Sequence, residues 1–152
     1  MININVLSEE KSWTKKLKKK EIFFNNLCKL FPKKFQFVNK KIYLTLLLSN
    51  NKNIKRLNKK FRNKNKHTDI LSFPFKQKKK LKEDYLGDII ISYNYMNKPK
   101  NLNTYDFKEK VTKIFIHGFL HLLNFDHKKN QDYKNMLKEE KLIYQSVISK
   151  FN

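Results

Sequence analysis

Three of the four histidines in this chain fall within eleven residues, at positions 117, 121 and 127. His117 and His121 are spaced i and i+4, so on a helix their imidazoles stand one turn apart on the same face and can share one ion. His127 reaches that ion only if the helix ends and the chain turns back. Asn124 is suited to this turn because Asn tolerates the left-handed backbone conformation found at helix C-termini. Any fold of this chain must therefore include a helix followed by a tight reversal.

A cluster of three neutral histidines predicts one zinc ion per chain. Three protein ligands leave the fourth position of zinc open for water, as in catalytic sites, whereas structural sites have four protein ligands. Two other interpretations remain open. The histidines can be scattered polar residues of an amphipathic helix, or Asp126 can complete a closed structural site. His67 is the fourth histidine, and we expect it to cap a loop or contact solvent or RNA.

The residue after the first ligand separates two kinds of zinc chemistry. Zinc peptidases have a Glu there as general base, and this chain has Gly118. The histidine spacing matches that of the metzincin peptidases, with Asn124 in place of their Gly, so the ligand geometry is shared without the base. A net charge of +22 favours a polyanionic partner, although the excess is nearly all Lys and in part reflects an AT-rich genome. We therefore expect RNA, with a phosphodiester as the bond cleaved.

The hydrophobic pattern predicts one domain over residues 1–152, of α/β (α+β) class, with helices packed on a four-stranded mixed sheet. The zinc site is expected on a helix and the turn after it. Strands are predicted at 3–7, 41–49, 70–73 and 88–92. Helices are predicted at 8–31, 50–64 and 106–123 and through residues 133–147, with an exposed loop at 76–84.

Location and partners are constrained by what the chain lacks. It has no run of about 18 apolar residues and no pattern typical of a secretory signal, so we expect a cytoplasmic protein without a membrane partner. Cys28 is the single cysteine, which excludes an internal disulfide, and we expect it in the core. Oligomeric state is not readable from the sequence.

Residues 117–127 resemble the hallmark of the YbeY family of bacterial rRNA-maturation endoribonucleases. The family motif is similar to His-Gly-x-Leu-His-Leu-x-Gly-x-Asp-His, and this chain departs from it in having Asn124 where the family has Gly. Two further segments are similar to the family: Leu57 to Pro74, with Phe61-Arg62 and Thr68-Asp69-Ile70-Leu71-Ser72-Phe73, and Leu86 to Ser92. The resemblance extends from about Leu44 to Met136.

The resemblance implies a single-strand-specific, zinc-dependent endoribonuclease. It implies a role in maturing the 3′ end of small-subunit (16S) rRNA and in ribosome quality control, with single-stranded rRNA and the small ribosomal subunit as partners. Metal ligands would be His117, His121 and His127, and catalytic residues Arg62 and His117. Arg62 matches a functional arginine of the family, and we expect its planar guanidinium to hold the scissile phosphate. The alternatives are a non-catalytic, zinc-stabilised ribosome-assembly factor and a zinc metallopeptidase.

Four other polar residues near these motifs have less certain roles. Asp126 can orient a ligand imidazole or accept a proton, and we favour the first. Asp69 and Asp88 lie at strand starts, where structural hydrogen bonding is an equal explanation. Ser72 belongs to the same sheet edge. The Lys-rich stretches at 52–66 and 76–82 can bind the RNA backbone without reading its sequence, although solvated charge is the ordinary role of such stretches.

Overall fold

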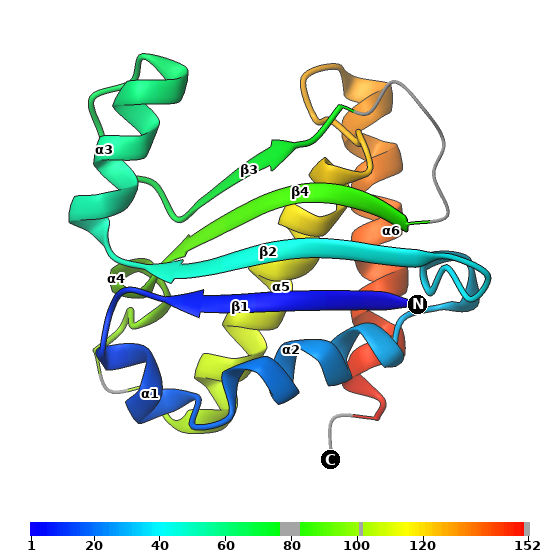
Figure 1. Cartoon of the computed structure of the whole chain (residues 1–152), viewed down its shortest axis with the longest axis horizontal. Helices are drawn as coiled ribbons and strands as arrows, with labels where there is room; N and C mark the ends of the chain where they lie inside the picture. Colours follow the sequence, from blue (N-terminus) through cyan, green and yellow to red (C-terminus); the bar gives the residue numbers. More distant parts are fainter. Residues whose placement is uncertain (77–82, 101, 151–152) are drawn as a thin grey trace.

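A computed structural model describes residues 1–76, 83–100 and 102–150. Its centre is a four-stranded sheet with the order β1-β2-β4-β3, formed by β1 (Ile2–Ser8), β2 (Lys41–Ser49), β4 (Glu83–Ser92) and β3 (Ile70–Pro74). The first three are parallel, and β3 runs antiparallel to β4 at one edge (Figure 1). The predicted four-stranded mixed sheet is therefore confirmed.

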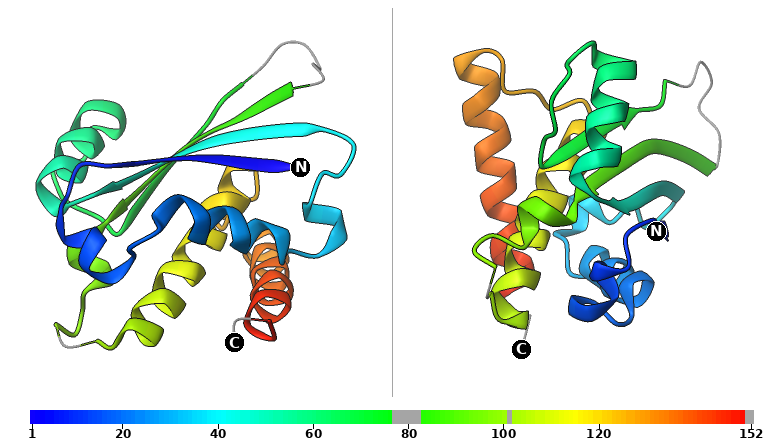
Figure 2. Two further views of the ribbon diagram at one scale, coloured as in Figure 1. Left: turned by 60° about the horizontal axis from the view of Figure 1, so that its bottom comes forward. Right: turned by 90° about the vertical axis from the view of Figure 1, so that its left-hand side faces the viewer.

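Most helices cover one face of this sheet. They are α1 (Ser12–Lys16), α2 (Lys20–Lys29), α5 (Thr104–Leu122) and α6 (Asn130–Ile148), and Figure 2 shows them on the same side of the strands. The alternation of β2 explains this arrangement, because Leu44, Leu46 and Leu48 are buried against the helices while Tyr43 and Thr45 point to the other face. Phe115 and Phe119 of α5 are fully buried in the same core.

Among the helices of the described residues, only α3 (Asn51–Arg62) lies on the other face of the sheet. It directly follows the C-terminal end of β2. The Asn50 side chain caps this helix by accepting a hydrogen bond from the Asn53 N–H at 2.9 Å. Ile54 packs with Leu71 and Ile90 in a second, small apolar cluster. This packing brings the C-terminal end of α3 beside edge strand β3, which is important for the site below.

The helix predicted from residue 8 to 31 is wrong in extent. The structure has β1 through Ser8, then α1 and α2 as separate helices, with Leu17 ending the first. One straight helix would place five lysines at positions 15–20 on adjacent turns, where like charges repel. The break also lets Trp13 reach the end of β2, where its indole N–H donates to the Ser49 carbonyl at 2.9 Å, while α2 runs along β1.

The remaining differences concern shorter segments. Strand β4 begins at Glu83 rather than at the predicted residue 88, so two residues of the predicted 76–84 loop are strand, and residues 77–82 of that loop lie outside the described part. A 3-10 turn (Lys33–Phe35) and a four-residue helix α4 (Tyr93–Met96) were not predicted. Cys28 is buried, as expected. Within the described residues, none of the helices combines the length and apolar character that a bilayer crossing requires.

Candidate metal centre

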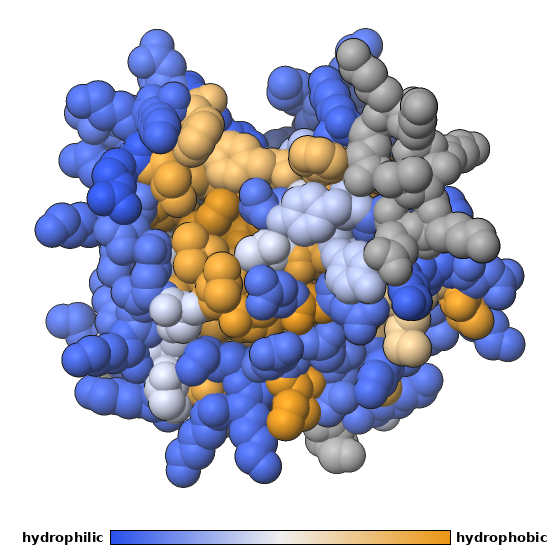
Figure 3. Space-filling view, in the orientation of Figure 1, coloured by the Kyte–Doolittle hydropathy of each residue, from blue (hydrophilic) through white to orange (hydrophobic). Residues whose placement is uncertain are grey.

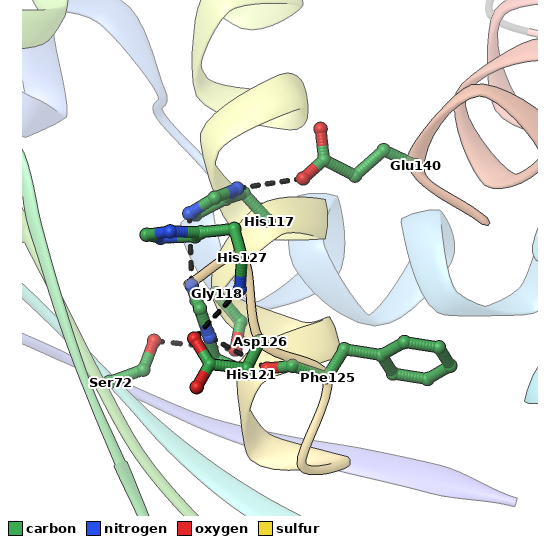
Figure 4. A network of polar contacts seen from close by, with 8 residues as sticks. All are labelled: Ser72, His117, Gly118, His121, Phe125, Asp126, His127 and Glu140. Carbon is green, nitrogen blue, oxygen red and sulfur yellow. Dashed lines mark hydrogen bonds and ion pairs between the residues drawn. The ribbon is translucent and has the colours of Figure 1, made fainter. Parts of the chain in front are cut away.

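The C-terminal end of α5 has the reversal that the histidine spacing requires. The N–H of Asn124 donates to the His121 carbonyl at 3.0 Å and the N–H of Phe125 to the Leu120 carbonyl at 3.0 Å, which is the hydrogen-bond pattern of a Schellman motif. Asn124 has φ of 70°, so it takes the left-handed conformation as predicted. The chain then runs back over the end of the helix and brings His127 beside the other two histidines (Figure 4).

Each of the two helical histidines is held through its Nδ1 atom. His117 Nδ1 lies 2.7 Å from a carboxylate oxygen of Glu140 on α6, and His121 Nδ1 lies 2.9 Å from the Phe125 carbonyl oxygen. A carbonyl oxygen and an ionised carboxylate only accept hydrogen bonds, so both Nδ1 atoms carry the proton. In the neutral imidazole with its proton on Nδ1, Nε2 has a bare lone pair, which is the form in which imidazole binds a metal.

These two Nε2 atoms face each other at 3.1 Å. Two lone-pair acceptors at this distance repel unless a proton or a metal cation lies with them. Two ligands of a tetrahedral zinc ion with Zn–N bonds of about 2.0–2.1 Å are about 3.3 Å apart, so the observed separation fits a shared ion. His127 offers a third nitrogen, and the ligand atoms of all three residues lie within 4.8 Å of one another. These three residues fit a metal ion, as the sequence predicted.

The electrostatics of the cluster favour the neutral form of His121. Burial lowers the pKa of His121, and the neighbouring His117 lowers it further, because a charged imidazole is poorly solvated and is repelled by a second one. Asp126 accepts a hydrogen bond from the backbone N–H of His127 at 2.7 Å, and this bond is the main cause of its lowered pKa. Asp126 thus holds the backbone of the third histidine, and the ionised carboxylate adds negative charge near the cation site.

The histidines open into a cleft of about 480 Å³, and Arg62 lines the same cleft. Arg62 is the last residue of α3, and its guanidinium donates to the Ser72 carbonyl of edge strand β3 at 2.9 Å. It also lies over the ring of Phe73, with its central carbon 5.5 Å from the ring centroid. The structure therefore brings Arg62 and His117 together, although 54 residues separate them in the sequence.

Gly118 has a structural role that its position after His117 does not reveal. A Cβ at this residue would lie 2.6 Å from Ile70 Cδ1, 3.0 Å from Ser72 Oγ and 3.3 Å from Ile89 Cγ2. Glycine here lets helix α5 approach the sheet closely, and the Ser72 hydroxyl donates to the Gly118 carbonyl at 3.3 Å. A side chain at position 118 would point at strands β3 and β4, so the peptidase base would not fit in this packing.

The other polar residues named from the sequence lie in different parts of the molecule. Asp69 lines the cleft, but its carboxylate accepts from the Ile70 N–H at 2.8 Å, a local structural bond. Asp88 is exposed on the opposite face of the sheet, where it accepts from the Tyr85 hydroxyl. His67 lies apart from the cluster, with Nδ1 2.8 Å from the Tyr95 hydroxyl.

Glu140 is the site residue that the motif search missed. It lies thirteen residues after His127, outside the motif, on the turn of α6 between the buried residues Met136 and Ile143. The spacing of four and three residues puts this carboxylate on the apolar stripe that faces α5. A charged residue in such an apolar stripe is unusual unless it has a partner. This is the feature of the sequence that could have identified Glu140.

Comparisons with known proteins agree with this geometry. A family model described as Endoribonuclease YbeY matches residues 5–148. A curated Endoribonuclease YbeY from Pelagibacter ubique is 62% identical over 151 residues, which is 99% of each chain. Another with that name, from Buchnera aphidicola, is 37% identical over 134 residues, 79% of this chain and 86% of the relative.

A solution structure of a protein from Thermotoga maritima shares the fold. It aligns with a TM-score of 0.58 and 24% identity, covering 99% of this chain and 91% of that one. At that identity the likeness concerns the fold alone. The family model and the Pelagibacter ubique relative extend over the α3 end, the edge strand and the histidine turn that together form the cleft. On these grounds the chain belongs to the YbeY family.

Proposed function

We propose that this chain is a zinc-dependent endoribonuclease that cleaves single-stranded RNA at the three-histidine cleft. The observation that carries the proposal is the pair of Nε2 atoms of His117 and His121, 3.1 Å apart, in a cleft that is also lined by Arg62. A metal cation and a guanidinium on one cleft suit a substrate with a negatively charged, tetrahedral phosphate. The name Endoribonuclease YbeY of the relatives supports the reaction class.

Zinc is the ion that these donors suit best. Three neutral imidazoles and no thiolate match the ligand set of catalytic zinc sites, whereas Mg²⁺ prefers oxygen ligands. Bound zinc supplies Lewis acidity, which lowers the pKa of a water molecule and offsets negative charge on phosphoryl oxygens. The metal ligands are His117, His121 and His127. Glu140 acts on the metal site through its hydrogen bond with His117.

The protein residues have separate roles in this proposal. Arg62 binds the non-bridging oxygens of the scissile phosphate, and its bond to the Ser72 carbonyl holds the guanidinium at the cleft edge. Glu140 keeps the proton of His117 on Nδ1, so that Nε2 stays available. The Phe125 carbonyl does the same for His121. Asp126 positions the backbone of His127 rather than its ring.

The biological setting follows from the family. We propose that the substrate is rRNA of the small ribosomal subunit near the 16S 3′ end, that the protein takes part in ribosome quality control, and that it works in the cytoplasm as one domain over residues 1–152. The net charge of +22 supports a polyanionic substrate.

The test measures bound zinc and cleavage of a single-stranded rRNA fragment by the same preparations of protein. We compare wild type with His117→Ala and Arg62→Ala, and use Lys29→Ala on α2 as the control that removes one exposed positive charge elsewhere. His117→Ala should lose both zinc and cleavage. Arg62→Ala should retain zinc but cleave about 100-fold more slowly or worse, as expected for loss of one donor to the reacting phosphate.

Other results would contradict the proposal. Undiminished cleavage by both variants would place the reaction elsewhere. Bound zinc and bound RNA without cleavage would favour a non-catalytic assembly factor, and digestion of casein without RNA cleavage would favour a peptidase. A duplex of the same sequence should resist cleavage, which checks the preference for single strands.

A further inference from the structure

The face of the sheet opposite α5 and α6 carries aromatic side chains in an open position. Phe61 at the end of α3 is 59% exposed and Phe75 beyond β3 is 55% exposed. Phe73 lies between them, with its ring centroid 5.5 Å from that of Phe61, and Phe75 lies 5.6 Å from Tyr85. Figure 3 shows this face with apolar surface at its middle and hydrophilic side chains around it. We call Phe61, Phe73 and Phe75 the aromatic strip.

The backbone explains why the three rings share a face. Phe73 alternates with Ser72, which points toward Gly118 of α5, so Phe73 points to the opposite side. The Phe75 N–H donates to the Leu86 carbonyl at 2.8 Å, which continues the ladder of β3 by one residue. Phe73 and Phe75 are therefore neighbours along one side of edge strand β3, about 7 Å apart.

Arg62 connects the aromatic strip to the metal cleft. Its guanidinium donates to the Ser72 carbonyl at the strand edge, lines the cleft on one side, and lies over the Phe73 ring on the other. A ligand that leaves the cleft past Arg62 crosses one strand and meets the rings of Phe73 and Phe61. The cleft and the strip are thus two parts of one continuous surface around β3.

The charges beside the strip suit a polyanion. Helix α3 contains six cationic residues and no Asp or Glu between Asn51 and Arg62. Both arginines of the chain, Arg56 and Arg62, are in this helix, although lysine supplies the other 33 of the 35 basic residues. Enrichment in Lys explains lysines anywhere on the surface, but it does not explain why the two arginines share one helix. Arginine binds phosphate through a planar fork and stacks on rings better than lysine does.

We propose that the aromatic strip binds unpaired bases of the single-stranded RNA on one side of the scissile phosphate, while α3 binds the neighbouring phosphates. Exposed aromatic rings beside a basic wall are the general means of holding single strands, because every base has a π face that can stack. Paired bases are already stacked and would not reach the rings. The strip therefore makes the site selective for single strands, and this inference rests on the proposed endoribonuclease function.

One carboxylate on this face limits the path of the strand. Asp88 is exposed on β4 and is engaged by the Tyr85 hydroxyl, which also contacts Thr45. A polyanion is repelled from Asp88. The RNA therefore follows the side of the face formed by α3 and β3, where Lys60 lies 5.3 Å from the centroid of the Phe61 ring.

The experiment measures RNA affinity in EDTA, so that cleavage does not interfere. The probe is a fluorescent 16-nucleotide single strand of mixed sequence, compared with the same strand in a duplex. Phe61→Leu and Phe75→Leu keep apolar volume but remove the stacking ring. Each should weaken binding of the single strand by about five-fold to 100-fold and leave duplex binding unchanged. Phe61→Trp should bind the single strand at least as well as wild type.

Tyr133→Leu is the matched control, because this ring is 53% exposed but lies on α6, away from the strip. Circular dichroism checks that all variants are folded. Single-strand affinity equal to wild type in both Phe→Leu variants overturns the inference and leaves the face to a protein partner. Cleavage of the same strand by the wild type is assayed separately with zinc present. If the wild type binds but does not cleave the strand and the Phe→Leu variants lose affinity, the strip is supported and the nuclease proposal is contradicted, so the two failures are distinguishable.

Discussion

Replacement of Glu140 by Gln changes one charge next to the metal site and almost nothing else. The side-chain amide keeps the length of the glutamate and an acceptor oxygen for the Nδ1–H of His117. The observed contact of 2.7 Å has the length of a charge-assisted hydrogen bond. Such bonds contribute roughly 1.5–3 kcal/mol, against about 0.5–1.5 kcal/mol for neutral ones.

The expected loss in zinc affinity follows from that difference. Glu140 and His117 are each 28% exposed, so solvent screens part of the charge and the lower end of the range applies. We expect Glu140→Gln to lose about 1 kcal/mol, or close to five-fold in zinc affinity. Glu140→Ala also releases the His117 tautomer, because Nε2 can then carry the proton, and it should lose about 10-fold to 100-fold.

Zinc affinity is measured by competition with a chromophoric chelator at neutral pH, with nitrogen-15 NMR of the imidazoles to read the His117 tautomer. Glu139→Gln is the control, since it removes a charge one residue away that pairs with Lys34 at 2.7 Å instead of with a histidine. The order of affinities should be wild type and Glu139→Gln first, then Glu140→Gln, then Glu140→Ala. Equal affinity in all four proteins would refute the reasoning that Glu140 positions a metal ligand.

Three further predictions concern stability. Gly118→Ala should lower the free energy of unfolding in urea by about 1–3 kcal/mol, because its Cβ would lie 2.6 Å from Ile70 Cδ1; a loss below 0.5 kcal/mol would show that the helix shifts freely. Asn124→Ala should destabilise by about 1 kcal/mol, whereas Asn124→Gly should be neutral or stabilising, since φ is 70° there; the reverse order would contradict the turn assignment. Burial and Glu109 raise the pKa of Tyr144 to about 12, so the stability that its protonated hydroxyl contributes is complete below pH 10 and is lost as the pH rises from 10 to 12. In unfolding measured against pH, Tyr144→Phe should lose less stability than wild type over that window, and an equal loss in both proteins would argue against this role.

Local sequence signals predicted the parts of the fold that local physics controls. The strand at 41–49 and the helix that follows it were predicted because strands and helices place apolar residues at different periods along the chain. The break between α1 and α2 was not, since the apolar spacing of Trp13 and Leu17 suits a continuous helix as well as a broken one. The location of the Ser49 carbonyl that binds the Trp13 indole decided between them.

The same division holds within the candidate site. His117 and His121 share a helix face by spacing alone, and Asn124 signals the turn that returns His127, so the sequence by itself determined the three-histidine cluster. The side-chain positions of a helix repeat every about 3.6 residues, and a C-terminal turn is formed by a few consecutive residues, so neither depends on a distant partner.

Only the tertiary structure decided what surrounds those histidines. The packing of α6 on α5 brings Glu140 to His117, and the packing of α3 on β3 brings Arg62 into the cleft. The close approach of α5 to the sheet gives Gly118 a role in packing, which is separate from the missing peptidase base. These contacts join residues distant in sequence, and burial of apolar surface between elements selects them, so spacing along the chain does not by itself specify which residues meet.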